Sequence, residues 1–222
     1  MNIIPVEFSI VVAGEDCNPT VLNPDFLRCR EIVPEQWGWE LADTPFTTRG
    51  LSIVSYTSDV LIKVEPNRFQ VIDSSGVADV AQSKAIQIAR RYIEILPHVR
   101  YTAVGNNVQL FLEVDDPVQF LEKHFVNPGS LGQQESALKD IELSFTYDRE
   151  DACLTISFEN NVLLREQGDK VKQAPGVGIA ANFHRECTGY PTNAQVLLHI
   201  DKMAGDISSF EPILHRLLPA EI

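Results

Sequence analysis

Hydrophobic residues recur at helical spacing in the middle of the chain. Ala85, Ile88 and Tyr92 lie three or four positions apart between residues 78 and 96, and Pro97 follows directly. One face of an α-helix repeats every 3.6 residues, and proline cannot continue a helix. The pattern therefore predicts a central helix over residues 78–96.

Apolar and polar residues alternate in the segment that follows this helix. Between residues 101 and 114, Val108, Leu110 and Leu112 occupy alternate positions. Alternation of this kind is typical of a strand with one apolar face. We expect the central helix to pack on that face.

The same two patterns predict the remaining elements. Strands are expected at residues 3–12, 51–56, 60–64, 69–72, 141–147, 153–158, 162–165, 177–183 and 196–200. Short helices are expected at residues 25–32 and 120–125, and an amphipathic helix at residues 207–218. Turn-forming residues separate most strands, including Asn160 and Asn161, so neighbouring strands are expected to pair antiparallel.

These elements divide the chain into two halves. We predict an α+β protein with β-rich halves at residues 1–126 and 135–222, each a largely antiparallel sheet with a packed helix, and a linker at residues 127–134. Leu110–Phe125 and Val196–Leu218 share the order strand, Asp, helix. Two explanations stay open. The halves are an internal duplication, or two separate joints use Asp near a helix start, where an acid is favoured.

Composition indicates a folded protein with an acidic surface. The 222 residues are 44% hydrophobic and 22% charged, which is ordinary for a globular protein. The chain has 18 Lys and Arg against 31 Asp and Glu, a net charge of -13. Such a surface repels phosphate backbones and anionic lipids. We therefore expect no direct nucleic-acid or membrane binding, and instead a protein partner that is basic.

The cysteines and the first residues favour a cytoplasmic protein. The four cysteines are far apart and form no CxxC pair. The first residues have no basic leader, and Pro5, Glu7 and Ser9 interrupt their apolar part, unlike a signal peptide. No run approaches the ~18 apolar residues of a membrane helix. Reduced thiols in the cytoplasm are the expectation.

Each motif that resembles a catalytic or cofactor site is incomplete. Residues 176–181 match GxGxxA, but their alternation favours a strand over the strand-to-helix turn that a dinucleotide needs. His184 and Glu186 match the HxE of zinc deaminases, yet no cysteine follows Cys187. The histidines show no metal-site spacing, and no GxSxG element is present. We expect no cofactor and no metal site, and the sequence leans against an enzyme without deciding the question.

Two tryptophans are the first candidates for a binding surface. Trp37 and Trp39 flank a glycine, so an extended chain would place both rings on one face. Exposed aromatic residues of this kind anchor protein partners. A place in the core is the alternative.

Two polar stretches within strands are the second candidates. Gly105, Asn106 and Asn107 interrupt an apolar strand, which indicates either a β-bulge or the close approach of another backbone or a ligand. Asn182 and His184 lie in the other stretch, in a strand of the second half. Together the two stretches predict a groove between the halves.

Two segments carry a resemblance to other proteins. LPHVRYTAVGNNVQLFLEV, which follows a strand and a long helix, and LLHIDKMAGDISSFEPILHRLL near the end of the chain resemble a sporadically distributed group of uncharacterised bacterial proteins of about this size. The resemblance covers most of the chain and implies no established activity. The patchy distribution of the group implies a place in mobile or defence-related gene neighbourhoods.

These observations favour one function and leave a second one open. The first hypothesis is a non-catalytic cytoplasmic binding or adaptor protein that serves as a component or regulator of a bacterial defence or toxin system. The rival is a small-molecule-binding protein or an enzyme with a site between the halves. Either one is compatible with a homo-oligomer.

Overall fold

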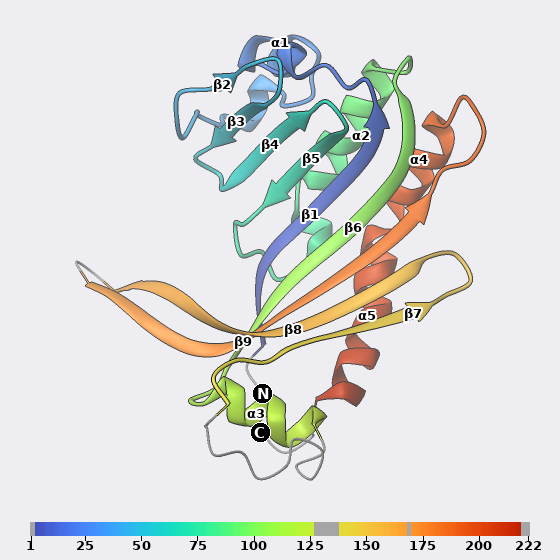
Figure 1. The fold of residues 1–222 in the computed structure, drawn as a ribbon. Coiled ribbons are helices and arrows are strands. Elements are labelled where there is room, and N and C mark those ends of the chain that lie inside the picture. Colours follow the sequence, from blue (N-terminus) through green and yellow to red (C-terminus); the bar gives the residue numbers. More distant parts are fainter. Residues whose placement is uncertain (1–2, 127–137, 168–169, 219–222) are drawn as a thin grey trace.

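The computed structural model describes residues 3–126, 138–167 and 170–218, and it confirms the α+β prediction (Figure 1). The strands are β1 (Ile3–Glu15), β2 (Phe46–Thr47), β3 (Ser52–Tyr56), β4 (Val60–Glu65), β5 (Arg68–Asp73), β6 (Arg100–Glu113), β7 (Glu142–Asp148), β8 (Cys153–Gln167) and β9 (Lys170–Glu186). The α-helices are α1 (Pro24–Cys29), α2 (Ala85–Ile95), α3 (Pro117–Phe125), α4 (Asn193–Asp201) and α5 (Met203–Leu217). Short 3-10 helices are η1 (Pro19–Val21), η2 (Glu35–Trp37) and η3 (Val80–Gln82).

All of these strands belong to one antiparallel sheet. Its order is β2-β3-β4-β5-β1-β6-β9-β8-β7, so β6 from the first predicted half pairs with β9 from the second. The prediction of a separate sheet in each half is therefore wrong. A long central strand such as β6 would otherwise leave one edge of backbone N–H and C=O groups unpaired.

The central helix is shorter than its apolar pattern predicted. Asp79 caps η3, and the hydroxyl of Ser83 accepts a hydrogen bond from the backbone N–H of Ala85 at 3.1 Å. α2 therefore begins at Ala85. The ring of Tyr92 on α2 stacks on Phe69 of β5, with centroids 3.8 Å apart.

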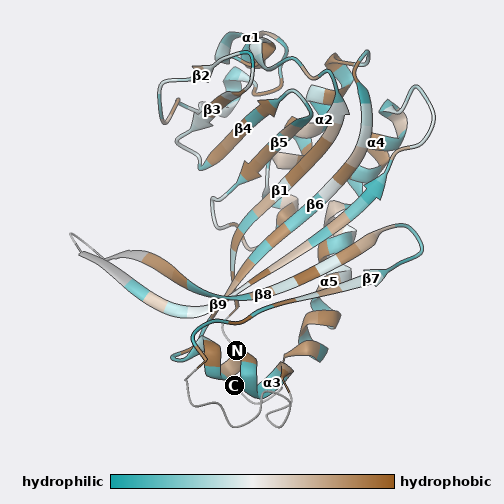
Figure 2. Cartoon of the chain, in the orientation of Figure 1, coloured by the Kyte–Doolittle hydropathy of each residue, from teal (hydrophilic) through white to brown (hydrophobic). Residues whose placement is uncertain are grey.

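The long helices lie behind one face of the sheet, and the core fills the space between (Figure 1). In β1, the alternating residues Phe8, Ile10 and Val12 are buried and belong to this core. Figure 2 shows the same alternation as hydrophobic and hydrophilic bands along the strands. We call the opposite face of the sheet the open face. It carries the residues that alternate with the core residues along each strand.

The last predicted strand, residues 196–200, is instead part of α4. Val196 and Ile200 are both buried, and four residues is one helical turn, so a five-residue window fits either period. The second copy of the strand-Asp-helix order is thus missing. Asp116 caps α3, whereas Asp201 ends α4. Internal duplication is not confirmed.

The predicted turn at residues 160–161 is also wrong, because β8 continues through it to Gln167. β6 pairs with β9 only between Gly176 and Glu186, while β8 pairs with β9 along its whole length. The outer ends of β8 and β9 therefore form a two-stranded arm that projects from the sheet (Figure 1). The predicted linker at residues 127–134 lies outside the described residues.

Candidate functional site

Uncharged polar side chains form a row across the open face, one on each of five neighbouring strands. The strand register aligns Ser9 of β1, Asn107 of β6, Asn182 of β9, Thr155 of β8 and Thr146 of β7. Two of these positions, on β6 and β9, were predicted to share a groove, and the structure brings them together. Side chains on one face of a strand recur every second residue. A second row, parallel to the first, therefore lies two residues further along each strand.

The second row is also mainly polar. It contains Glu7 of β1, Gln109 of β6, Ala180 of β9, Ser157 of β8 and Ser144 of β7. On the other side of the first row lie Gly105 of β6 and His184 of β9, which are register partners. Of the residues predicted for the groove, four therefore share the open face.

Three hollows follow one another along this face. Their volumes are about 260, 250 and 300 Å³. The first two share Gln109, Ser157 and Ala180, and the last two share Asn182. We call the three hollows together the open-face groove. It runs between the base of the arm and the end of β9 that carries His184.

Small residues deepen the groove at its centre. Ser9 and Ala103 are only 4% and 6% exposed, although the long helices lie on the other face. A Cβ added at Gly105 would lie 2.9 Å from Nδ2 of Asn182, which is too close. Glycine at this position therefore makes room for the Asn182 side chain. The register continues through Gly105 without a shift, so no β-bulge lies at Gly105 itself; the irregularity in the pairing of β1 with β6 lies between Ala103 and Tyr101, at the start of the same stretch.

Two asparagine amides form the centre of the groove. Nδ2 of Asn107 donates to the backbone oxygens of Gly105 at 3.1 Å and Ser9 at 3.3 Å, and Oδ1 of Asn107 accepts from Nδ2 of Asn182. The amide oxygen of Asn182 has no hydrogen-bond partner among the residues that the structure describes. Asn182 lines two of the three hollows, so this oxygen is an acceptor that the groove can offer to a ligand.

Ionisable side chains line each of the three hollows: Glu159 the first, Glu7 the middle one, and Arg68 with His184 the last. Burial raises the pKa of the Glu7 carboxyl, and a hydrogen bond from Ser9 partly opposes this shift. Nε2 of Gln109 lies 3.5 Å from Oε1 of Glu7. In the last hollow, Nε2 of His184 is 2.7 Å from Oε1 of Glu186. The middle hollow therefore combines one carboxyl group, that of Glu7, with hydrogen-bonding amides and hydroxyls.

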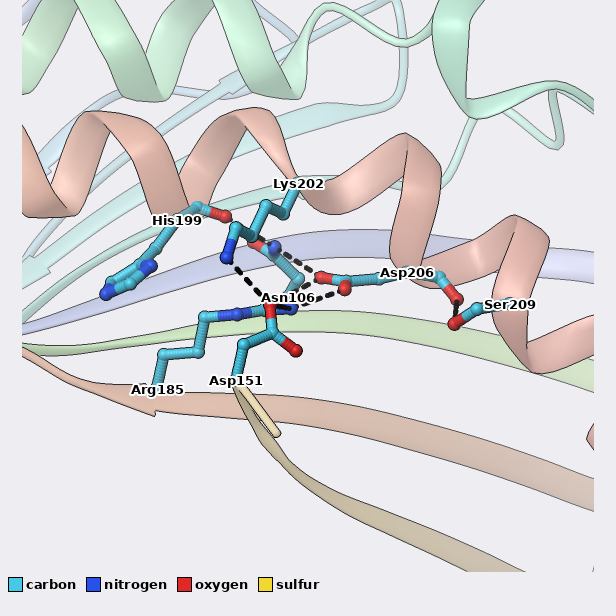
Figure 3. A network of polar contacts seen from close by, with 7 residues as sticks. All are labelled: Asn106, Asp151, Arg185, His199, Lys202, Asp206 and Ser209. Carbon is cyan, nitrogen blue, oxygen red and sulfur yellow. Dashed lines mark hydrogen bonds and ion pairs between the residues drawn. The ribbon is translucent and has the colours of Figure 1, made fainter. Parts of the chain in front are cut away.

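Asn106 does not belong to the groove, contrary to the prediction. It faces the helices and is 1% exposed, because neighbouring residues of a strand point to opposite faces. Its Nδ2 donates to Oδ2 of Asp206 at 2.9 Å and to the backbone oxygen of His199 at 2.8 Å (Figure 3). Asn106 thus connects β6 to α4 and α5.

A buried ion pair completes this network. Nη1 and Nη2 of Arg185 bind Oδ2 and Oδ1 of Asp206 at 2.8 and 2.6 Å, and both side chains are under a tenth exposed. Asp151, in the turn between β7 and β8, reaches Arg185 at 3.2 Å and Lys202 at 2.7 Å (Figure 3). We call Asn106, Asp151, Arg185, Lys202 and Asp206 together the buried network. It holds the helices against the sheet that carries the groove.

The buried network shifts the pKa values of two side chains, His199 and Asp151. Burial, and then the charges of Arg185 and Lys202, lower the pKa of His199. The hydrogen bond from Lys202 and the charge of Arg185 lower the pKa of Asp151, although burial partly opposes this. The cations of the network therefore favour the charged form of Asp151 and disfavour the charged form of His199.

The buried network was not predicted from the sequence. Its signal was two charged residues at core positions: Arg185 follows Phe183 by two in a strand, and Asp206 lies on the apolar face of α5 with Met203 and Phe210. A charge at such a position needs a buried partner of opposite sign. That pairing was the available clue.

Trp37 and Trp39 lie away from the groove, Trp37 as the last residue of η2 and Trp39 just beyond Gly38. Both rings are half-buried and pack against the core, with centroids 4.8 Å apart. The core alternative is therefore correct in part, since each ring also keeps some exposed surface. Trp39 lines a separate hollow.

Comparisons with other proteins add no name to this site. No protein-family model matches the chain, and no curated protein matches its sequence. Within the described part of the chain, no helix is both long and apolar enough to cross a membrane. No three His, Cys, Asp or Glu side chains gather there as ligands for a metal ion.

Proposed function

We propose that this chain is a non-catalytic binding protein that holds an extended segment of a protein partner in the open-face groove. The observation that carries the proposal is the pair of polar rows across β1, β6, β9, β8 and β7. Amide and hydroxyl side chains both donate and accept hydrogen bonds, as the backbone of an extended peptide does. The small residues between them let another backbone approach closely.

The length of the groove suits an extended chain. Its lining follows β9 from Gly178 to His184, and a strand rises about 3.4 Å per residue, so the groove is about 20 Å long. About six residues of an extended segment cover this length. The hollows are shallow and continuous rather than one deep cavity, which suits a strand-like ligand better than a compact one.

Charge supports a basic partner. The chain has a net charge of -13, which attracts a positively charged protein and speeds its association. Within the groove, Glu7 is half-buried and offers a carboxylate to a Lys or Arg side chain of the bound segment. We propose that the segment carries such a residue opposite Glu7.

A small polar molecule in the same groove is the second candidate. Each hollow of about 250–300 Å³ is near the lower size of small-molecule sites, and the free amide oxygen of Asn182 would accept a hydrogen bond from it. An enzyme site in this groove would lack Asn106, because Asn106 faces the helices. A cytoplasmic location, a homo-oligomer, an origin of the two halves by duplication and a role in bacterial defence or toxin systems also remain proposals, the last from the resemblance alone.

Site-specific photo-crosslinking in native cells tests the proposal. A benzoylphenylalanine is placed at exposed Gln109 or at His184, which lines the far end of the groove, and a control is placed at exposed Glu211 on α5. We expect one protein adduct from both open-face positions and none from the control. Equal adducts at all three positions, or none at the open face, would contradict the proposal. If a small molecule co-purifies and no adduct forms, the second candidate is correct.

A further inference from the structure

The two tryptophans and Tyr56 form an aromatic cluster beside η2. Trp37 and Trp39 are 4.8 Å apart at 52°, and Trp39 lies 5.5 Å from Tyr56 at 53°. Gly38 between the tryptophans has φ 65°, a left-handed conformation that glycine adopts without strain. This residue ends η2 and turns the chain so that both indoles lie side by side.

A hollow of about 410 Å³ adjoins this cluster, which we call the aromatic hollow. Its apolar wall includes Trp39, Tyr56 and Leu41, and Leu41 is 41% exposed. Its charged rim includes Asp25, Arg28 and Glu35. A solvent-exposed leucine next to two aromatic rings leaves apolar surface that an incoming side chain can cover.

The rim favours a cation. Asp25 and Arg28 form an ion pair at 2.9 Å, so their charges largely cancel. Glu35 is exposed and has no ion-pair partner in the described part of the chain. The remaining charge of the rim is therefore negative, as is the charge of the whole chain.

The cluster already holds one ammonium group. Nζ of Lys84 lies 5.4 Å from the centroid of Trp37, within the range of a cation–π contact. Trp37 does not line the aromatic hollow, but its neighbour Trp39 does. The chain thus uses one indole to bind a cation internally and presents the other to an open hollow.

We propose that the aromatic hollow is a second binding site, which takes the side chain of a Lys or Arg residue from a protein partner. The aliphatic stem would cover Leu41, and the charged group would lie over Trp39 and near Glu35. This site is separate from the open-face groove, so it stands or falls independently of the groove.

Intrinsic probes make the test specific. The chain has two tryptophans, and both lie in this cluster, so the indole N–H signals in a nitrogen-labelled NMR spectrum report on it alone. The full chain is titrated with N-acetyl-arginine amide, N-acetyl-lysine amide, the neutral N-acetyl-norleucine amide and N-acetyl-diproline amide. The two cationic probes should shift the Trp39 signal and bind about fivefold more tightly than the neutral ones.

Exposed variants avoid any effect on folding. Glu35→Gln should weaken binding of the arginine probe about two- to threefold, and Glu40→Gln, an exposed neighbour outside the hollow, should leave it unchanged. Trp37→Phe assigns the remaining signal to Trp39. Equal binding of the norleucine or diproline probe, a shift confined to Trp37, the same effect in both Gln variants, or no shift at all would each overturn the proposal.

Discussion

Removal of the Asp206 carboxylate is the sharpest test of the buried network. Asp206 is 5% exposed and accepts hydrogen bonds from Asn106 at 2.9 Å and from Arg185 at 2.8 and 2.6 Å. The side chain of Arg185 is 3% exposed, and in Asp206→Ala its remaining carboxylate partner among the described residues would be Asp151, at 3.2 Å. Breaking a buried pair by removing one partner destabilises a protein by about 3–5 kcal/mol. Because Asp151 stays, we expect a value near the lower end of this range.

A matched carboxylate lies a few residues away. Asp201 ends α4 and pairs with Arg90 at the surface, where its side chain is 47% exposed. Exposed pairs contribute about 0–1 kcal/mol, so Asp201→Ala should change stability little. The free energy of unfolding is measured for both variants by urea denaturation followed by circular dichroism. The double variant Arg185→Met with Asp206→Leu should recover most of the loss, because no buried charge is left unpaired.

These variants show whether the buried ion pair stabilises the fold. If Asp206→Ala lowers the free energy of unfolding by no more than Asp201→Ala does, the buried pair does not hold the helices to the sheet. If the double variant is as unstable as Asp206→Ala, the loss comes from packing around α5 rather than from an unpaired charge.

Three other predictions follow from the same structure. The pKa of His199 is lowered in the folded chain, so as the pH falls the unfolded chain binds this proton first. The free energy of unfolding should therefore fall as the pH drops below about 6.5. Urea denaturation at several pH values measures this dependence, and His199→Gln should make it weaker. Cys29 is exposed whereas burial raises the pKa of Cys187 to about 11, so a thiol reagent should modify Cys29 first and Cys29→Ser should remove the fast phase. A Cβ at Gly176 would lie 2.3 Å from a backbone oxygen, so Gly176→Ala should destabilise by about 1–3 kcal/mol, while Gly50→Ala, with open space around it, should not; equal effects would contradict this.

Local periodicity predicted the elements that are long and strongly patterned. The alternation in β1 and β6 and the helical spacing in α2 and α5 each extend over enough residues to exclude the other period. The five residues 196–200 do not, because Val196 and Ile200 fit a strand and a helix equally. Pairing between distant strands, such as β6 with β9, depends on burial of the whole sheet, which no single window contains.

The candidate site could be predicted only in part for the same reason. Asn107 and Asn182 were expected to share a groove because each interrupts an apolar strand, and the register confirms that they meet. Asn106 was placed with them, yet it has the same parity as buried Val108 and so faces the core. Asp206 approaches Arg185 only once α5 packs on the sheet, so its partner could not be identified from spacing.

The central claim is that the open-face groove binds an extended protein segment. The most direct measurement uses the segment that crosslinking at Gln109 identifies, made as a synthetic peptide, and follows the side-chain amide NMR signals of Asn107 and Asn182. These signals should shift in proportion to the peptide bound, while the signal of Asn106, on the opposite face, should not follow them. If the peptide binds but leaves both groove amides unchanged, the groove is not the binding site.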